Sequence, residues 1–273
     1  MGKNRVNFET EAVKREFAAS KSVGINKYVR IGIIVLALAI IVFIGYNFIN
    51  EKLGNNGTVD WVAYGKALAE IEAKYDDCEK VILKIDGNEI KKTEFYKLRI
   101  AQDYLYNSFM KEYRDYVKEH DDLSKEELEN LKPHNLTDEE IVENLIRTEL
   151  GYVAAMDAGL EMDYDRAYTQ MNSMYYYYIE IVDTADETSD IAIKAQEFIT
   201  QAELVSKGMG ITVNDYVRYL SRESMKSMAM SMLEAQWQTY FEDSDYDGDI
   251  DDYIEKRYKD LESVYEIENF GLE

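Results

Sequence analysis

Residues 81–95, VILKIDGNEIKKTEF, determine how the folded domain begins. Val81–Ile85 is an apolar, β-branched run that predicts a strand, and the polar segment Asp86–Asn88 after it predicts a tight turn. Thr93 is placed to cap the start of a long helix that extends to about Glu119. The sequence therefore predicts a strand that turns directly into a helix.

Outside this segment, apolar residues recur mostly at spacings of three and four, which is the period of an amphipathic helix. Thr137–Glu140 has the pattern of a capping box. A charged hairpin is expected between Glu119 and Asn135, and residues 264–268 alternate as a strand does, so this second strand can pair with the first. The predicted helices cover residues 59–75, 93–119, 137–159, 166–182, 185–208, a short stretch from Thr212, 224–241 and 253–264. The fold class is mainly α, with a short strand near each end of the domain.

A separate feature precedes the domain. Ile31–Asn50 contains twenty residues and no charge, which is enough for a helix to cross the ~30 Å apolar core of a bilayer. A cleaved signal peptide is the main alternative, but the apolar run is too long for one and its exit lacks a small-x-small cleavage pair. A buried core helix is a weaker alternative, because such helices are usually shorter. The sequence favours an uncleaved signal anchor.

Charge predicts the orientation of this anchor. The first thirty residues carry seven basic and three acidic side chains, whereas the chain as a whole has a net charge of −23. The positive-inside rule then keeps residues 1–30 in the cytoplasm as a basic tail and exports the rest. The expected organisation is a single-pass cell-membrane protein with a tail (1–30), a transmembrane anchor (31–50), a tether and juxtamembrane helix (51–78) and an extracytoplasmic helical domain (79–273).

Composition excludes several function classes. The strong negative charge of the exported part opposes nucleic-acid binding, because phosphates require a basic surface. Cys78 is the only cysteine, so no intramolecular disulfide can form and we interpret Cys78 as an inert thiol. We find no nucleophile–base pattern and no phosphate-binding glycine loop, so no enzymatic activity is predicted.

Residues 79–273 resemble the N-terminal domains of SurA/PrsA-type extracytoplasmic chaperones. The resemblance rests on the strand–turn–helix segment Val81–Phe95, on Leu145–Leu150 followed by Ala154–Leu160, and on Lys207–Val213. Members of that family often carry a parvulin prolyl isomerase module, for which this chain has neither the length nor the histidines, since only His120 and His134 are present. The resemblance implies holdase-like binding of unfolded exported chains, without catalysis or a required cofactor.

One segment has the pattern of a calcium loop. Asp243, Asp245, Asp247, Asp249 and Asp251 occupy loop positions 1, 3, 5, 7 and 9, and Gly248 occupies position 6. Position 12 departs from the pattern, because Ile254 stands where a bidentate glutamate belongs. The alternative interpretation is an acidic loop that caps the following helix. Calcium is therefore a candidate ligand rather than a requirement.

A second candidate site is an apolar surface rich in methionine and tyrosine, which are side chains that adapt to varied apolar partners. Met225, Met228 and Met232 are spaced as core residues, whereas Met230 is off that stripe and four successive tyrosines cannot all face inward on a helix. The proposed client-binding residues are Tyr175, Tyr176, Tyr177, Tyr178, Met230 and Trp237.

Together these patterns predict a membrane-anchored, chaperone-like protein that binds unfolded or exported polypeptides without modifying them. The alternative is a structural or assembly protein of the envelope that binds one specific folded partner. The sequence leaves a homo-oligomer open.

Overall fold

The computed structural model describes residues 59–119, 124–160, 162–185, 189–242 and 246–272, and 76% of these residues are helical. The mainly α fold class is thereby confirmed. In chain order the elements are α3 (Trp61–Ala69), α4 (Ile71–Lys74), β1 (Val81–Ile85), β2 (Asn88–Lys91), α5 (Lys92–Glu119), α6 (Lys125–Leu131), α7 (Asp138–Asp157), α8 (Tyr164–Thr184), α9 (Asp190–Met209), α10 (Val213–Glu242), α11 (Ile250–Val264) and β3 (Ile267–Asn269).

The helices accompany one small antiparallel sheet in the order β2-β1-β3. The predicted strand at residues 81–85 is confirmed, and it pairs with a C-terminal strand as expected, with Ile85 opposite Ile267. This second strand covers Ile267–Asn269 and not the predicted residues 264–268, because α11 continues to Val264. β2 was not predicted, because only Ile90 of its four residues is buried and the rest are polar. It follows the predicted turn, where Asp86 and Gly87 both have positive φ, as a tight two-residue hairpin requires.

The main core lies where α7, α10 and α11 pack against this sheet. Leu83 and Ile85 of β1 are fully buried, as are Leu233 of α10 and Leu261 of α11. α7 supplies Ile141, which follows the capping box predicted at Thr137, and that box is present with both of its hydrogen bonds. The N- and C-terminal parts are further joined by Lys92, whose ammonium pairs with Asp77 at 2.6 Å and donates to the carbonyl of Leu272.

Several helix boundaries differ from the sequence-based expectations. The helix predicted at 59–75 breaks at Glu70 into α3 and α4, and the charged hairpin contains the short helix α6. α5 begins at Lys92, and the Thr93 hydroxyl donates to the carbonyl of Cys78 at 2.8 Å, so Thr93 is not the helix cap.

The two helices predicted after Thr212 form one continuous helix, α10. Thr212 does cap its start, because its hydroxyl accepts the Asp215 N–H at 3.1 Å. The break predicted between these two helices is absent, because the polar residues near the middle of α10 are serines on a buried face. Ser221 is fully buried, and its hydroxyl donates to the Val217 carbonyl at 2.6 Å.

Helices α3 and α9 pack against each other through two glycines. A Cβ atom on Gly65 would lie 2.2 Å from the carbonyl oxygen of Val205, and one on Gly208 would lie 2.1 Å from that of Val62. Real Cβ atoms essentially never approach so closely, so any side chain at either position would force the helices apart. Only glycine permits this contact.

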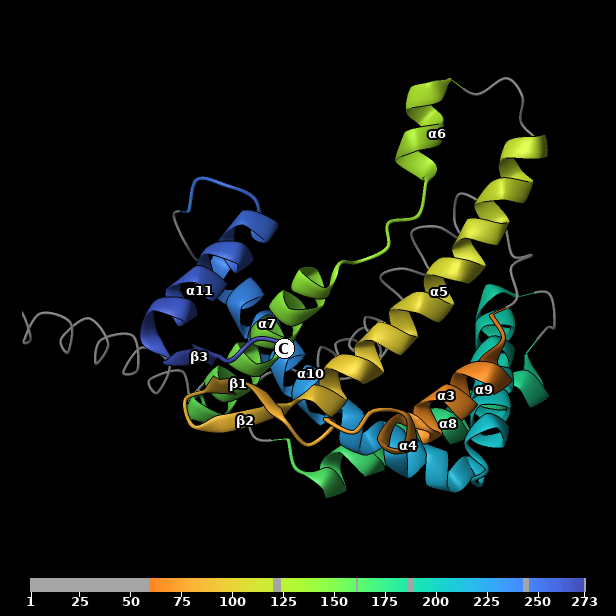
Figure 1. Cartoon of the computed structure of the whole chain (residues 1–273), viewed down its shortest axis with the longest axis horizontal. Coiled ribbons are helices and arrows are strands. Elements are labelled where there is room, and N and C mark those ends of the chain that lie inside the picture. Colours follow the sequence, from red (N-terminus) through yellow and green to blue (C-terminus); the bar gives the residue numbers. More distant parts are fainter. Residues whose placement is uncertain (1–58, 120–123, 161, 186–188, 243–245, 273) are drawn as a thin grey trace, which may run out of the picture.

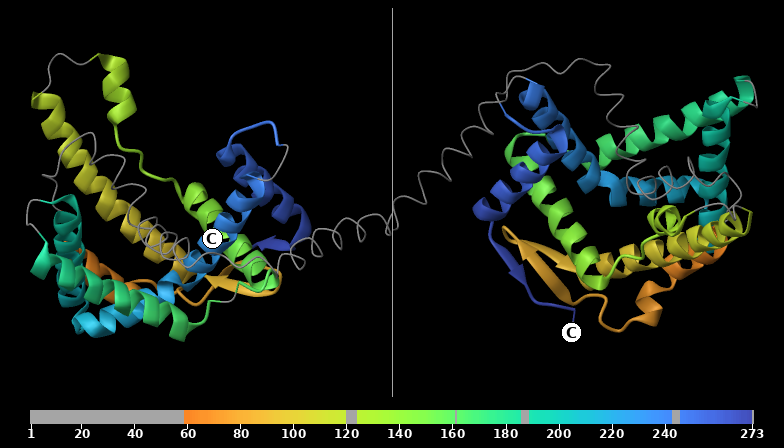
Figure 2. Two further views of the ribbon diagram at one scale, coloured as in Figure 1. Left: turned by 180° about the vertical axis from the view of Figure 1, so that it is seen from behind. Right: turned by 90° about the horizontal axis from the view of Figure 1, so that it is seen from above.

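The molecule has two ends joined by long helices. Figures 1 and 2 show the sheet, α7 and α11 at one end and α3, α8 and α9 at the other, with α5 and α10 extending between them. The predicted transmembrane anchor, Ile31–Asn50, lies outside the described residues. Within the part of the chain that the structure covers, no helix combines the length and the apolar character that crossing a bilayer would need.

Candidate binding surface

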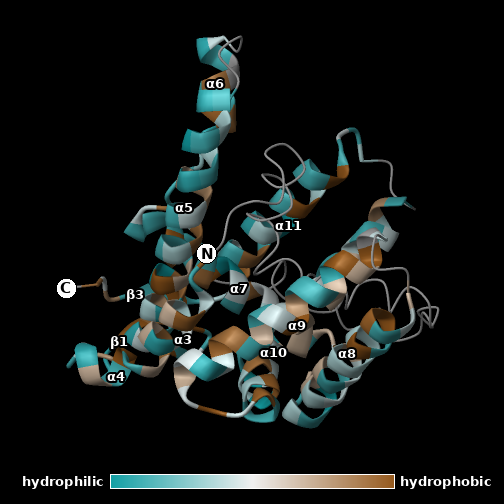
Figure 3. Cartoon of the chain, turned by 90° about the vertical axis from the view of Figure 1, so that its right-hand side faces the viewer, coloured by the Kyte–Doolittle hydropathy of each residue, from teal (hydrophilic) through white to brown (hydrophobic). Residues whose placement is uncertain are grey.

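Helices α8 and α9 follow each other in the chain, pack together and share a small core of their own. Asp163 and Ser189 cap their N-termini, and Ile181 of α8 packs against Ala192 and Ala195 of α9. Figures 1 and 3 show the two helices at one side of the molecule, away from the sheet. This α8–α9 hairpin carries the tyrosine run that the sequence singled out.

The four tyrosines divide into two inner and two outer side chains. Tyr178 packs edge-on against Phe198 with ring centroids 5.1 Å apart, and Tyr175 lies 6.4 Å from the same ring. Tyr176 and Tyr177 instead remain 62% and 53% exposed. The helix period explains the division, because consecutive residues are turned by about 100°. The inner tyrosines hold the hairpin together, and the outer tyrosines are available to a partner.

The hairpin also exposes two aliphatic side chains, Ile191 and Ile193 of α9, at 49% and 37%. Six large hydrophobic side chains are exposed in the described residues, and four of them belong to this one hairpin. Scattered single exposures of apolar side chains are ordinary, and four of them on one pair of helices make this hairpin the candidate binding surface. We call these four residues, Tyr176, Tyr177, Ile191 and Ile193, the hairpin patch; they share one pair of helices, and Ile191 and Ile193 are turned about 200° from each other on α9.

Two predicted members of the client-binding set belong elsewhere. Trp237 has no exposed surface and meets Tyr258 edge-on in the main core, with ring centroids 5.2 Å apart. Met230 is partly buried against α7, where a Cβ atom on Gly151 would lie 2.6 Å from its Cγ. Trp237 fills space between helices, so the prediction that it lines a binding surface is corrected, while that for the partly exposed Met230 stays a prediction.

The acidic segment divides between described and undescribed residues. Asp243 and Asp245 lie outside the described residues, while Asp247 and Asp251 are exposed. The carboxylate of Asp249 accepts the Asp252 N–H at 2.8 Å and caps α11, as the alternative interpretation expected. No group of three or more potential metal ligands occurs among the residues that the structure places. Calcium binding therefore stays a prediction.

The structure reveals a polar cluster that the sequence did not predict. Lys97 of α5 binds both carboxylate oxygens of Glu223 of α10, at 2.9 and 3.0 Å, and also contacts Glu94 at 3.3 Å. Burial raises the pKa of Glu223, and burial likewise raises the pKa of the neighbouring Tyr219 and of Tyr64 on α3. These residues are far apart in the chain, so no local sequence signal could have grouped them.

The cluster joins three helices. It connects α3, the first described helix, to α5 and α10, and Tyr64 meets Tyr104 of α5 with ring centroids 5.7 Å apart. Burial keeps its phenols protonated across the physiological pH range, because it raises their pKa values. We therefore interpret the cluster as a structural polar contact that fixes α3 in place.

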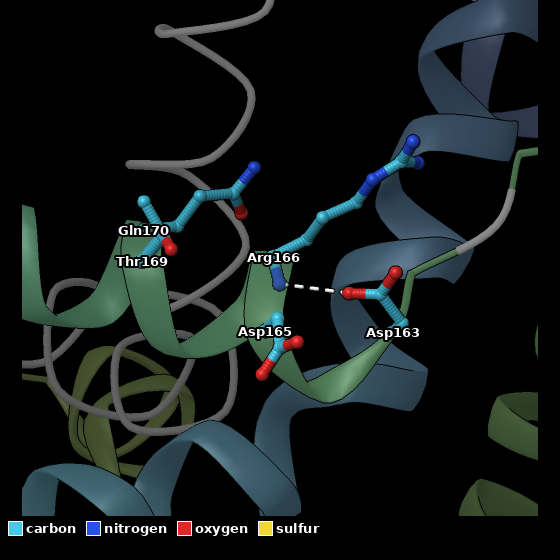
Figure 4. Close-up of a pocket in the computed structure, with 5 residues that line it drawn as sticks. All are labelled: Asp163, Asp165, Arg166, Thr169 and Gln170. Carbon is cyan, nitrogen blue, oxygen red and sulfur yellow. Dashed lines mark hydrogen bonds between the residues drawn. The ribbon is translucent and has the colours of Figure 1, made fainter.

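A shallow depression lies at the start of α8 (Figure 4). Asp163 and Arg166 lie at its rim, and the Asp163 carboxylate accepts the Arg166 backbone N–H at 2.8 Å. Its remaining lining residues are Asp165, Thr169 and Gln170. The depression contains neither histidine nor cysteine and is open to solvent. Its chemistry is that of a capped helix start, and it gives no indication of catalysis.

Comparisons with known proteins do not identify the chain. No protein-family model matches it, and neither a curated protein nor a solved structure shows significant similarity to it. The resemblance to SurA/PrsA-type domains therefore stays a prediction, and any function has to be inferred from the surface itself.

Proposed function

We propose that the chain is a membrane-anchored, extracytoplasmic, chaperone-like protein that holds unfolded segments of exported polypeptides without catalysis. The observation that carries this proposal is the hairpin patch, where Tyr176 and Tyr177 are exposed on a hairpin whose inner face is packed. A rigid support with exposed amphipathic rings suits loose binding, because tyrosine pairs a flat apolar ring with a polar tip.

The energetic scale also fits loose binding. Covering one exposed aromatic side chain contributes about 2 kcal/mol, so a few such contacts hold a chain without trapping it. The hydroxyls of the two rings can exchange hydrogen bonds with water or with a client backbone. A surface of this kind does not require one particular sequence in the bound segment.

The position of the patch relative to the proposed anchor supports the same function. Residues 51–58 separate the apolar segment from Val59, and a chain of that length spans at most about 28 Å. α3 follows at once and is packed onto α9 through Gly65 and Gly208. The hairpin would thus stay close to the site where exported chains emerge, which raises its local concentration there.

The proposal is tested with the full chain in lipid nanodiscs, by measuring how far it suppresses aggregation of an unrelated unfolding protein. We expect suppression by the native chain and its loss in the double variant Tyr176→Ser/Tyr177→Ser. The matched control is Met156→Ser, which removes an exposed apolar side chain from α7. Absence of suppression at every molar ratio would contradict the proposal and would favour the alternative, an envelope protein that binds one folded partner.

A further inference from the structure

β3 is an outer strand of the sheet. β1 lies between β2 and β3, so among the described residues β3 has one neighbouring strand and its far edge is unpaired. Figures 1 and 2 show it at the outside of the molecule. Glu268 and Asn269 are exposed, and Ile267 is half-buried against the core. An open strand edge is a template for pairing with another extended chain.

The hydrogen bonds to β1 show which backbone groups remain available. The Phe270 N–H donates to the Ile82 carbonyl at 2.9 Å, and the Glu266 carbonyl accepts from Asp86 at 3.0 Å. Backbone groups of alternate residues in a strand point in opposite directions within the sheet. The even-numbered residues therefore face β1, and the N–H and carbonyl groups of Ile267 and Asn269 face outward.

The negative charge along this strand edge favours a basic binding partner. Glu266 and Glu268 are exposed along the strand, and Asp86 is exposed at the turn beside it. Lys84 of β1 lies opposite Glu268, and these four residues together keep a net negative charge. Pairing β3 with β3 of a second copy would bring these carboxylates together, and like charges placed opposite each other are destabilising. The edge therefore favours a basic segment over self-association.

Phe270 adds an apolar contact at the end of the strand. Its side chain is 52% exposed, although it follows directly after the sheet residues. Residues two apart in a strand share a face, so Phe270 lies on the same face as Glu268. Gly271, with φ of 76°, donates its N–H to the Asn269 side chain at 2.9 Å and turns the chain away from the edge.

We propose that the free edge of β3 binds an extended client segment as a fourth, antiparallel strand, with a basic residue opposite Glu268 and an apolar residue opposite Phe270. Ile267 and Asn269 together offer four backbone hydrogen-bonding groups to this segment. The proposal specifies a class of client and in that respect rests on the proposed function, but its contacts are separate from the hairpin patch.

The test measures binding of fluorescent peptides to the full chain in nanodiscs. The first peptide repeats Val-Thr-Lys-Thr, which places valine and lysine alternately on one face of a strand. The second replaces lysine with glutamate, and the third carries N-methyl groups on the backbone nitrogens of alternate residues. We expect the first peptide to bind, with an affinity that falls as salt is added. We expect each of the other two to bind at least about tenfold more weakly. The second loses the charge pairing, and the third loses the backbone hydrogen bonds.

Two variants of the protein test the same strand edge. Asn269→Pro removes an outward N–H, and Asn269→Ala removes the same side chain while keeping that N–H. We expect the proline variant to bind the first peptide about tenfold more weakly than the alanine variant. Equal affinity of the methylated and unmethylated peptides would overturn the proposal, and this arm does not depend on how the proline variant folds.

The double variant Tyr176→Ser/Tyr177→Ser should bind the peptide as the native chain does. Peptide binding without aggregation suppression would leave the edge proposal intact and contradict the proposed function. Aggregation suppression without peptide binding would contradict the edge proposal and leave the proposed function intact.

Discussion

The sheet end of the molecule and the crossing of α3 with α9 are both buried, but they are held together in opposite ways. At the sheet end, large side chains such as Leu83 and Trp237 fill the space between elements. At the crossing, Gly65 and Gly208 bring two helix backbones into direct contact because they have no side chains. The sheet end depends on large side chains that fill its interior, and the crossing depends on two residues that have no side chain.

This difference has consequences for function. The sheet end fixes the fold of the domain as a whole, because it joins β1, α7, α10 and α11. The glycine crossing determines how α3 packs on α9. Since α3 follows the proposed anchor and α9 carries half of the hairpin patch, a change at the crossing should alter the placement of the binding surface without unfolding the domain.

The largest effect is expected from Leu83→Ala at the sheet end. Leu83 is fully buried in the central strand, so its truncation removes apolar contacts and leaves a cavity. We expect a loss of about 3 kcal/mol in the free energy of unfolding, measured by chemical denaturation. Leu83→Met, which nearly conserves volume, serves as the control and should cost less than half as much. Equal losses would show that this position is not tightly packed.

Gly208→Ala tests the crossing and should have the next largest effect. Alanine favours helix over glycine by about 1 kcal/mol, but its Cβ would overlap the Val62 carbonyl. We expect the overlap to prevail and to destabilise the docking of α3 by about 2 kcal/mol. Hydrogen exchange should then quicken in residues 61–69 and stay unchanged in β1. Lys207→Ala, an exposed neighbour, is the control, and slower exchange in α3 of the Gly208 variant would contradict the packing argument.

A smaller effect is expected at the capping box of α7, which packs against β1. Thr137→Ala removes the hydroxyl that accepts the Glu140 N–H at 3.2 Å. The loss should be about 1 kcal/mol in the free energy of unfolding. Thr137→Ser keeps the acceptor and should be nearly neutral. If both variants lose the same amount, the methyl group and not the cap is responsible.

The smallest effect concerns the pH dependence of the sheet end. Burial raises the pKa of Glu234, whose carboxylate accepts the Tyr258 hydroxyl at 2.8 Å. The folded state therefore takes up this proton at higher pH than the unfolded state, so Glu234 contributes stability that grows as pH falls through its folded pKa. In Glu234→Gln this contribution should vanish, so the free energy of unfolding of the variant, measured at several pH values relative to that of the native chain, should fall as pH is lowered through the folded pKa of Glu234. An unchanged profile would contradict the assignment.

Local signals predicted much of the fold. The strands at 81–85 and near the C-terminus, the turn at Asp86 and the capping box at Thr137 depend on neighbouring residues, and all are present. The continuity of α10 was missed because buried serines, such as Ser221, made its inner face look polar. The glycine crossing was missed because Gly65 and Gly208 are distant in sequence and their roles depend on each other.

The binding surface was predicted in part. Four successive tyrosines indeed do not all face inward, but the sequence did not indicate that Tyr176 and Tyr177 would be the exposed pair. Trp237 was misplaced because its burial depends on α11, which folds over it from later in the chain. Ile191 and Ile193 were missed, since alternating isoleucines at the start of a helix give no sign of which side the neighbouring helices leave uncovered.

The central claim is that the hairpin patch holds unfolded segments, and site-specific photo-crosslinking tests it most directly. A photoreactive amino acid is placed at position 176, 177 or 156 of the full chain in nanodiscs, and an unfolded exported polypeptide is added. We predict strong adducts from positions 176 and 177 and weak ones from position 156, with loss of all adducts when the polypeptide is folded first. Equal crosslinking from the three positions, or stronger crosslinking to a folded protein, would contradict the account.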